Sequence, residues 1–238
     1  MAKYDFFASK KASVISRILE KTLRRKFEQK FFLNFKRNVI SVLEIGVGKG
    51  EFAQGVIRRN VEYTGYEPNG KMLESLLEKG INVKQVSVPP FPEEDNRFDG
   101  IMMIQVFEHM PTLQAAEEVL KESYRVLRDD GKIMIISPSY LAWKDDFFDL
   151  DFTHTFPTTA NRLQQMLQDS GFYDVRICYY WGGFFSEVWR IADIFLRLLR
   201  SVAGFFLPRS VAYSTRFRKL GMLFAENICV EAYKQAGK

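Results

Sequence analysis

The sequence predicts an α/β fold with a mostly parallel sheet covered by helices on both faces. From Val39 to Tyr180, short β-rich apolar runs alternate with amphipathic stretches of helical spacing, a pattern typical of parallel strands joined by helices. The first strand runs directly into a turn with glycines at alternate positions, Gly46, Gly48 and Gly50. The 238 residues are 47% apolar and 26% charged, a composition typical of a globular domain.

The chain opens with a basic segment that predicts one or two amphipathic helices. Apolar residues recur at helical spacing over residues 10–33, with lysines and arginines between them. Residues 1–37 carry eleven Lys/Arg and three Asp/Glu, a net charge of +8. We therefore divide the chain into residues 1–37 and a main domain over residues 38–238.

The first half of the main domain alternates regularly between strands and helices. Strands are predicted at 39–45, 63–67 and 83–86, because these runs are apolar and β-rich. Helices are predicted between them at 51–59, directly after the glycine turn, and at 69–79. A proline-rich loop over 89–96 then leads to a strand at 98–107.

The second half continues the alternation and is then interrupted. A strongly periodic helix at 112–127 ends before Asp129-Asp130-Gly131, and a strand follows at 132–137. After a long loop, a helix at 158–169 stops at Gly171 and a strand follows at 175–180. Residues 181–225 form an insertion with a helix predicted at 186–206, and residues 227–234 form the final strand.

Charge and cysteine content restrict the class of protein. Residues 38–180 carry a net charge of −8 and residues 181–225 a net charge of +5, so an acidic centre is flanked by two basic segments. Attraction of these segments to an anionic membrane surface is one interpretation, and a solvated basic face is the other. The only cysteines are Cys178 and Cys229, which indicates a reducing, cytoplasmic location, at most peripheral at the inner membrane face. No set of ligands has the spacing of a metal site, so we expect no metal.

Several polar residues coincide with strand ends that meet at one edge of such a sheet. Glu67 ends the second strand about twenty residues after the glycine turn, where a carboxylate can accept hydrogen bonds from ribose hydroxyls. Glu108 and His109 lie just past the fourth strand. Together these positions predict a nucleotide-like cofactor site in the crevice beyond the strands.

These motifs resemble the class I S-adenosylmethionine-dependent methyltransferases, most closely their small-molecule branch. The resemblance rests on Leu-Glu-Ile-Gly-x-Gly-x-Gly at residues 43–50 and on Phe-Asp followed by Glu-His at residues 98–109, and it covers roughly residues 39–180 plus the last strand. It implies a Rossmann-like, seven-stranded, mostly parallel sheet with an antiparallel last strand. It also implies S-adenosylmethionine as cofactor.

The resemblance also implies which residues hold the cofactor. The methionine part would lie among Glu44, Gly46, Gly48 and Gly50, and Glu67 would hold the ribose. The usual aspartate after the third strand is missing, so Gln85, Ser87 or backbone groups alone would serve the adenine. Gln105, at the end of the fourth strand, is assigned to the cofactor site as well.

Two histidines are candidates for acid–base chemistry. His154 lies in an Asp-x-Thr-His motif, which related enzymes acting on saccharides and other small acceptors often show, and Asp151 of this motif can raise the basicity of the imidazole. The hypothesis is that His154 is the general base or binds the acceptor. The simpler interpretation is a loop histidine bonded to backbone. His109 is a second catalytic candidate, or only packs beside the cofactor.

The preferred function is methyl transfer to an oxygen of a small, saccharide or lipid-linked acceptor. The insertion then forms a wall over the acceptor, lies in a membrane interface, or packs on residues 10–33 or on another subunit. Alternatives are a nucleic-acid methyltransferase, which the absence of an Asn-Pro-Pro-Tyr element disfavours, and a protein that binds S-adenosylmethionine without catalysis. The sequence leaves the oligomeric state open.

Overall fold

The computed structural model describes residues 14–36, 38–181 and 225–237, and six further residues within 182–224. Those six are helical and are Ile191, Ile194, Phe195, Leu198, Leu199 and Val202. The rest of the predicted helix at 186–206, and residues 10–13 of the predicted N-terminal helices, lie outside the described residues.

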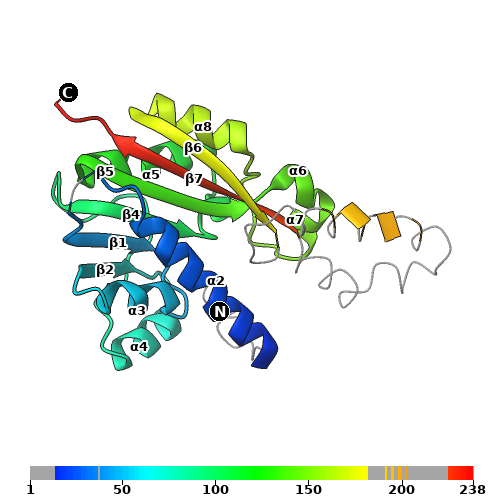
Figure 1. The fold of residues 1–238 in the computed structure, drawn as a ribbon, viewed down its shortest axis with the longest axis horizontal. Helices are drawn as coiled ribbons and strands as arrows, with labels where there is room; N and C mark the ends of the chain where they lie inside the picture. Colours follow the sequence, from blue (N-terminus) through cyan, green and yellow to red (C-terminus); the bar gives the residue numbers. More distant parts are fainter. Residues whose placement is uncertain are drawn as a thin grey trace.

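One seven-stranded sheet forms the centre of the molecule, in the order β3-β2-β1-β4-β5-β7-β6 (Figure 1). β7 pairs antiparallel with β5 and β6, and the other neighbouring pairs are parallel, which confirms the predicted Rossmann-like sheet with its antiparallel last strand. The strands are β1 Ser41–Ile45, β2 Glu62–Tyr66, β3 Val83–Lys84, β4 Phe98–Ile104, β5 Leu127–Pro138, β6 Phe172–Trp181 and β7 Glu226–Lys234.

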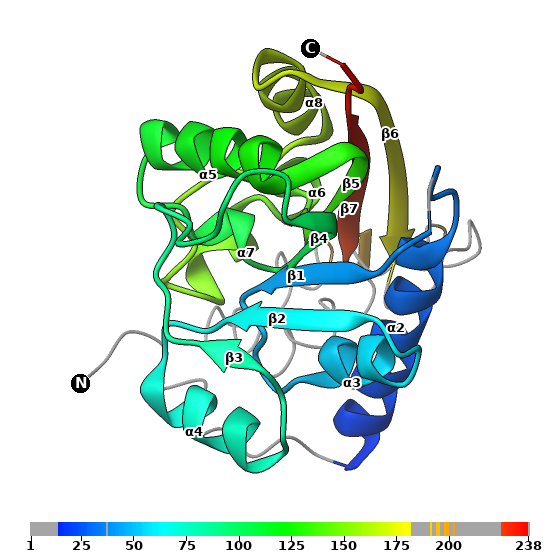
Figure 2. The same cartoon turned by 90° about the vertical axis from the view of Figure 1, so that its left-hand side faces the viewer.

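Helices cover both faces of this sheet, and the strands alternate their side chains between the two layers (Figure 2). Leu43 and Ile45 of β1 lie in the core beneath α5 (Leu113–Val126) and α8 (Ala160–Asp169). Val42 points to the opposite core, which the second group of helices covers. That group is α2 Val14–Phe32, α3 Glu51–Ile57 and α4 Gly70–Glu78. Burial on both faces explains why the strands read as continuous apolar runs.

The described part of the N-terminal segment belongs to this second core. Phe27 and Phe31 of α2 are fully buried and contact the sheet. Lys132 of β5 donates a hydrogen bond to a carbonyl oxygen just after α2, and Lys30 of α2 forms an ion pair with Glu231 of β7. α2 is therefore fixed to the sheet by apolar and charged contacts. Among the described residues, no helix combines the length and the apolar character that crossing a bilayer requires.

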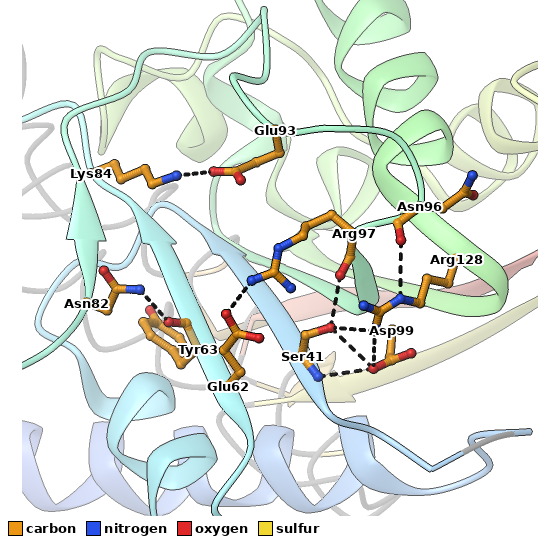
Figure 3. A network of polar contacts seen from close by, with 10 residues as sticks. All are labelled: Ser41, Glu62, Tyr63, Asn82, Lys84, Glu93, Asn96, Arg97, Asp99 and Arg128. Carbon is orange, nitrogen blue, oxygen red and sulfur yellow. Dashed lines mark hydrogen bonds and ion pairs between the residues drawn. The ribbon is translucent and has the colours of Figure 1, made fainter.

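A buried polar network fixes the amino ends of β1 and β4, at the edge opposite the carboxyl ends of these strands. Asp99 Oδ2 accepts hydrogen bonds from the backbone N–H groups of Ile40 and Ser41 at 2.9 and 3.0 Å, and Arg128 forms an ion pair with it at 3.1 Å (Figure 3). These contacts offset the cost of burying the carboxylate. Asp99 therefore has a structural role.

Several predicted bounds differ from the structure by a few residues, and three differences have a clear local description. The predicted long loop after the fifth strand contains two short helices, α6 (Tyr140–Trp143) and α7 (Asp145–Asp149). β5 begins at Leu127 and includes Asp129-Asp130-Gly131 as an irregularity, with Asp130 at a positive φ of 59°. β4 ends at Ile104 because Gln105 has a φ of 57°, and a 3-10 turn, η1, follows at Phe107–His109.

Candidate active site

The polar segments that the sequence predicts to meet do lie at one edge of the sheet. Figure 2 shows β1, β2 and β3 pointing the same way, as their parallel pairing requires. The glycine turn follows β1, Glu67 follows β2, and η1 follows β4. The loop that contains His154 follows β5 and is tied to η1, since the backbone N–H groups of Thr155 and Phe156 both bond the carbonyl oxygen of Glu108.

The three glycines of the turn have positive φ angles and serve different purposes. A Cβ on Gly46 would lie 2.4 Å from a methyl group of Val106, so Gly46 lets the segment after β4 approach the turn. A Cβ on Gly50 would lie 2.6 Å from Ile81. A Cβ on Gly48 would meet nothing within 4 Å. Gly48 alone of the three borders open space, so the turn leaves room for a ligand at this position.

Glu67 points back into the turn. Its Oε2 accepts a hydrogen bond from the backbone N–H of Gly48 at 3.0 Å, and its Oε1 accepts one from the N–H of Asn69 at 3.0 Å. Burial raises the pKa of this carboxyl, and the two N–H donors oppose that shift. The open space at Gly48 and the adjacent carboxylate fit an adenosyl ligand, and the role of Glu67 toward a ribose stays a prediction.

Glu44 lies inside the sheet. It is fully buried in β1, and the hydroxyl of Tyr63 donates a hydrogen bond of 2.6 Å to its Oε2. Burial raises the pKa of Glu44 to about 8, although the Tyr63 bond lowers it. Its predicted contact with the methionine part of a cofactor stays a prediction.

The last two candidates for cofactor binding are both exposed. The side-chain amide of Gln105 donates a hydrogen bond of 3.3 Å to Oδ1 of Asn227 in β7. The backbone N–H of Gln105 donates to the carbonyl oxygen of Ile136. Gln105 has a positive φ of 57°, which is strained for a residue other than glycine. Such strain is common at functional sites. Ser87 lies in the loop after β3. The last residue of β3, Lys84, accepts a hydrogen bond from the N–H of Glu67 through its carbonyl oxygen. Both assignments stay predictions.

The structure brings the two candidate histidines together. Their ring centroids are 4.9 Å apart. His154 Nδ1 is 2.7 Å from the carbonyl oxygen of Phe147, and His109 Nδ1 is 3.1 Å from the carbonyl oxygen of Thr153. A carbonyl oxygen can only accept, so each Nδ1 carries the proton and each Nε2 carries the lone pair.

Asp151 is connected to His109 only through Thr153, and it lies near His154 without a hydrogen bond. Its Oδ1 accepts a hydrogen bond from the hydroxyl of Thr153, and that hydroxyl lies 3.0 Å from His109 Nδ1. Its Oδ2 is 3.7 Å from His154 Nε2, beyond hydrogen-bond distance. Burial lowers the pKa of His154, with Asp151 opposing, so the neutral imidazole with a basic Nε2 is favoured. The arrangement can accept a proton from a bound hydroxyl.

The sequence places Glu108 just past the fourth strand at the predicted cofactor crevice, but it does not predict the burial of this residue or its approach to both histidines. The structure buries it completely, and Ser137 donates a hydrogen bond of 2.9 Å to its Oε2. Burial raises its pKa to about 8. Glu108, His109 and His154 each place one potential metal-ligating atom within 4.8 Å of the others. The signal in the sequence was a carboxylate directly after the apolar pair Val106-Phe107.

Comparisons with known proteins agree on one family. A family model described as a methyltransferase domain matches residues 10–177. An uncharacterized methyltransferase of Anoxybacillus flavithermus is 30% identical over 146 residues, 55% of this chain and 68% of that protein. A protein of Mycobacterium tuberculosis named as a probable S-adenosylmethionine-dependent methyltransferase is 28% identical over 181 residues, 72% of this chain and 64% of its own length.

Solved structures share the fold. An S-adenosylmethionine-dependent methyltransferase from Archaeoglobus fulgidus superposes with a TM-score of 0.61 at 21% identity, covering 93% of this chain and all of that one. A phosphoethanolamine N-methyltransferase of Haemonchus contortus gives a TM-score of 0.64 at 15% identity over 88% of this chain and 52% of that chain. At these identities the likeness concerns the fold alone.

Proposed function

The chain belongs to the S-adenosylmethionine-dependent methyltransferases, and from this premise we propose that it methylates an oxygen atom of a small acceptor. The observation that carries the choice of oxygen is the pair His109 and His154, each with Nδ1 bonded to a backbone carbonyl and Nε2 left basic, beside a glycine turn and a carboxylate that suit the cofactor. S-adenosylmethionine supplies a methyl group on a sulfonium, which leaves readily as the thioether. The protein therefore has to hold the cofactor, align the acceptor and accept a proton.

The cofactor is held by the turn and by the residues that follow β2 and β4. Gly48 provides the space, Glu67 provides acceptors for the ribose hydroxyls, and Glu44 and Gln105 border the methionine part. Ser87 lies on the adenine side. These roles follow from position, since each of the five residues lies in a strand, in the turn, or in a segment that follows a strand at the carboxyl edge.

The acceptor oxygen is activated at the histidine pair. His154 removes the proton of the acceptor hydroxyl through Nε2, the oxygen attacks the methyl carbon, and the carbon–sulfur bond breaks to release S-adenosylhomocysteine. The carbonyl oxygen of Phe147 fixes the ring of His154 through Nδ1, and Asp151 stabilises the positive charge once Nε2 has taken the proton. His109 is fixed beside it through Thr153. Val106 lies against Gly46 of the cofactor turn and is only three residues before His109 in the sequence. The histidine pair is therefore close in sequence to a residue that contacts the turn.

A saccharide or lipid-linked acceptor at a membrane surface is the finer part of the proposal. The six described residues within 182–224 are separated alternately by three positions and by one position. This is the spacing of residues on one face of an α-helix. All six are apolar and between 46% and 69% exposed. Arginines at 190, 197 and 200 are close to them in sequence. An apolar face beside basic residues is typical of a helix that lies in a membrane interface.

The names of similar proteins support a small acceptor. One is a demethylmenaquinone methyltransferase of Lactobacillus johnsonii, 27% identical over 187 residues and covering 63% of this chain and 75% of that protein. Another is the phosphoethanolamine N-methyltransferase above. Neither names the acceptor of this chain.

Radiolabelled methyl transfer tests the function. Purified protein with labelled S-adenosylmethionine is incubated with lipid, polysaccharide and RNA fractions of a cell extract, and we expect label in the lipid or polysaccharide fraction. His154→Ala should reduce the label at least about tenfold without changing the affinity for the cofactor. Label in RNA alone would overturn the acceptor class, and unchanged transfer by His154→Ala would overturn the role of that residue.

Vesicle co-sedimentation tests the membrane part. We expect binding to anionic vesicles at low salt, and weaker binding for Phe195→Glu and Leu198→Glu. Leu113→Glu is the matched control, because Leu113 is a similarly exposed apolar residue at the start of α5. Absence of binding at low salt, or equal loss in the control, would contradict the membrane proposal.

A further inference from the structure

Two histidines and a buried glutamate converge where η1 meets the loop that follows β5. Glu108 and His109 come from η1, and His154 comes from the loop whose N–H groups bond Glu108. One ligating atom of each residue lies within 4.8 Å of those of the other two. The three side chains therefore lie close together, although they are separated by up to 46 positions in the sequence.

The histidines are oriented as metal ligands are. Each Nδ1 donates to a backbone carbonyl oxygen, of Phe147 for His154 and of Thr153 for His109. Such a bond fixes the ring and the tautomer and presents Nε2 as the ligating nitrogen.

Glu108 supplies an independent observation. Its side chain is fully buried, and its Oε1 has no hydrogen-bond partner among the described residues, whereas its Oε2 is bonded by Ser137. A buried carboxylate oxygen without a partner is costly, and a cation at the convergence point would satisfy it.

The dimensions allow a cation if the three side chains move closer together on binding. Ligand atoms at about 2.1 Å from a transition metal lie about 3 to 4.2 Å from one another, so atoms that now lie within 4.8 Å of one another would close by up to about 1.8 Å. Oδ2 of Asp151, 3.7 Å from His154 Nε2, offers a further oxygen at the rim.

We propose that Glu108, His109 and His154 bind a divalent transition-metal ion, and that this ion holds the acceptor oxygen. Two imidazoles and one carboxylate favour zinc, manganese, iron or cobalt over magnesium or calcium. The inference rests on the proposed function and deepens it, because an ion at this point changes His154 from proton acceptor to ligand. The ion lowers the pKa of the bound acceptor hydroxyl, the proton passes to Asp151 or to solvent, and the oxygen then displaces the thioether from the methyl carbon.

Metal titration of the chelator-treated full chain tests the site without any acceptor. Calorimetry with Mn²⁺ and Zn²⁺, and visible absorption with Co²⁺, should show one equivalent bound. Glu108→Gln and His109→Ala should weaken binding at least about tenfold. Glu118→Gln, a change of an exposed glutamate on α5, should not. Absence of stoichiometric binding, or binding that Glu108→Gln and His109→Ala leave unchanged, would overturn the site.

Binding of S-adenosylmethionine, measured on the same proteins, separates this inference from the proposed function. We expect cofactor binding within about threefold of wild type in Glu108→Gln, which also shows that the variant is folded. Cofactor binding and methyl transfer without metal binding would reject the metal site and leave the proposed function intact. Absence of cofactor binding in the wild type would reject the proposed function itself. Metal binding combined with methyl transfer that chelation leaves unchanged would overturn the role of the ion toward the acceptor.

Discussion

The carboxylate of Glu67 accepts a hydrogen bond from the backbone N–H of Gly48 at 3.0 Å, which ties the end of β2 to the turn after β1. A second N–H, of Asn69, holds the other oxygen. The carboxylate is therefore held against the open side of the turn before any ligand arrives. This preorganisation reduces the conformational cost of binding a cofactor.

Replacing Glu67 by Gln should weaken S-adenosylmethionine binding about 10- to 100-fold, because a hydrogen bond to a charged group is worth about 1.5–3 kcal/mol. The amide keeps the shape of the side chain but loses the charge and one acceptor. Calorimetric titration measures the change. Glu78→Gln, at an exposed position on α4, is the control and should bind as wild type does. An unchanged affinity in Glu67→Gln would contradict a ribose-binding role.

Alanine at Gly48 should separate ligand binding from folding. The new Cβ meets no protein atom within 4 Å, so the cost to stability is only the backbone strain at a φ of 59°, about 1–2 kcal/mol. The Cβ would occupy the space left for the ligand, so cofactor affinity should fall at least about tenfold. Thermal unfolding and calorimetry measure the two effects. A folded variant with wild-type affinity would place the cofactor elsewhere.

Alanine at Gly46 should mainly reduce stability, whereas alanine at Gly48 mainly reduces cofactor affinity. The reason is that the new Cβ at Gly46 would lie 2.4 Å from a methyl group of Val106. We expect a loss of stability larger than that of Gly48→Ala, and partial recovery when Val106→Ala removes the clashing methyl groups. Denaturant unfolding of the two single variants and the double variant gives the coupling energy. A coupling energy of zero would mean that the two residues do not contact each other.

The order of strands and helices could be predicted from the sequence because each element carries its own local signal. The run around Val42 is apolar on both faces, and α8 ends where Gly171 follows, so periodicity and glycine position were sufficient. The irregularity at Asp130 could not be predicted, since a positive φ at a non-glycine residue depends on the strand it pairs with. α6 and α7 are too short for periodicity to reveal them.

Those parts of the candidate site that have a local sequence signal could also be predicted. The glycine turn and Glu67 are set by the local sequence of β1 and β2. The burial of Glu108 depends on a loop more than forty residues later, whose N–H groups at 155 and 156 fold back onto it. No local pattern around Glu108 contains that contact. The shared contact of Thr153 with His109 and Asp151 likewise exists only after folding.

Glu44 should make stability depend on pH. Its pKa is about 8 in the folded protein against 4.5 as the ordinary value, so the folded state holds a proton between these pH values that the unfolded state has lost. The free energy of unfolding should therefore fall as pH rises from about 4.5 to about 8. Tyr63, Arg24 and Glu67 are the charged or titratable groups that act on it.

Glu44→Gln should remove this contribution, since the amide oxygen can still accept the Tyr63 hydrogen bond but cannot titrate. The slope of unfolding free energy against pH should become less negative, by up to about 1.4 kcal/mol per pH unit. Urea unfolding of wild type and variant at pH 5, 6, 7 and 8 measures the difference. Glu108 is present in both proteins, so its own raised pKa cancels. Parallel curves would show that Glu44 is ionised in the fold.

Glu231 should be essential for docking α2 on the sheet. Its carboxylate lies 2.9 Å from Lys30 of α2 and 3.8 Å from Lys132, whose side chain is fully buried. Burial lowers the pKa of Lys132 to about 8, and Glu231 opposes that shift. Removing the negative charge leaves a buried ammonium without its counter-charge, which costs far more than losing a surface pair.

Glu231→Gln should therefore destabilise the protein by about 3 kcal/mol, whereas Glu62→Gln, which breaks the exposed pair with Arg97, should cost less than about 1 kcal/mol. Denaturant unfolding at pH 7 measures both. The double variant Lys132→Met with Glu231→Leu should recover most of the loss, because replacing both charges by apolar groups removes the need for compensation. If Glu231→Gln were as stable as Glu62→Gln, the ion pair would not hold α2, and its apolar contacts through Phe27 and Phe31 would account for the docking alone.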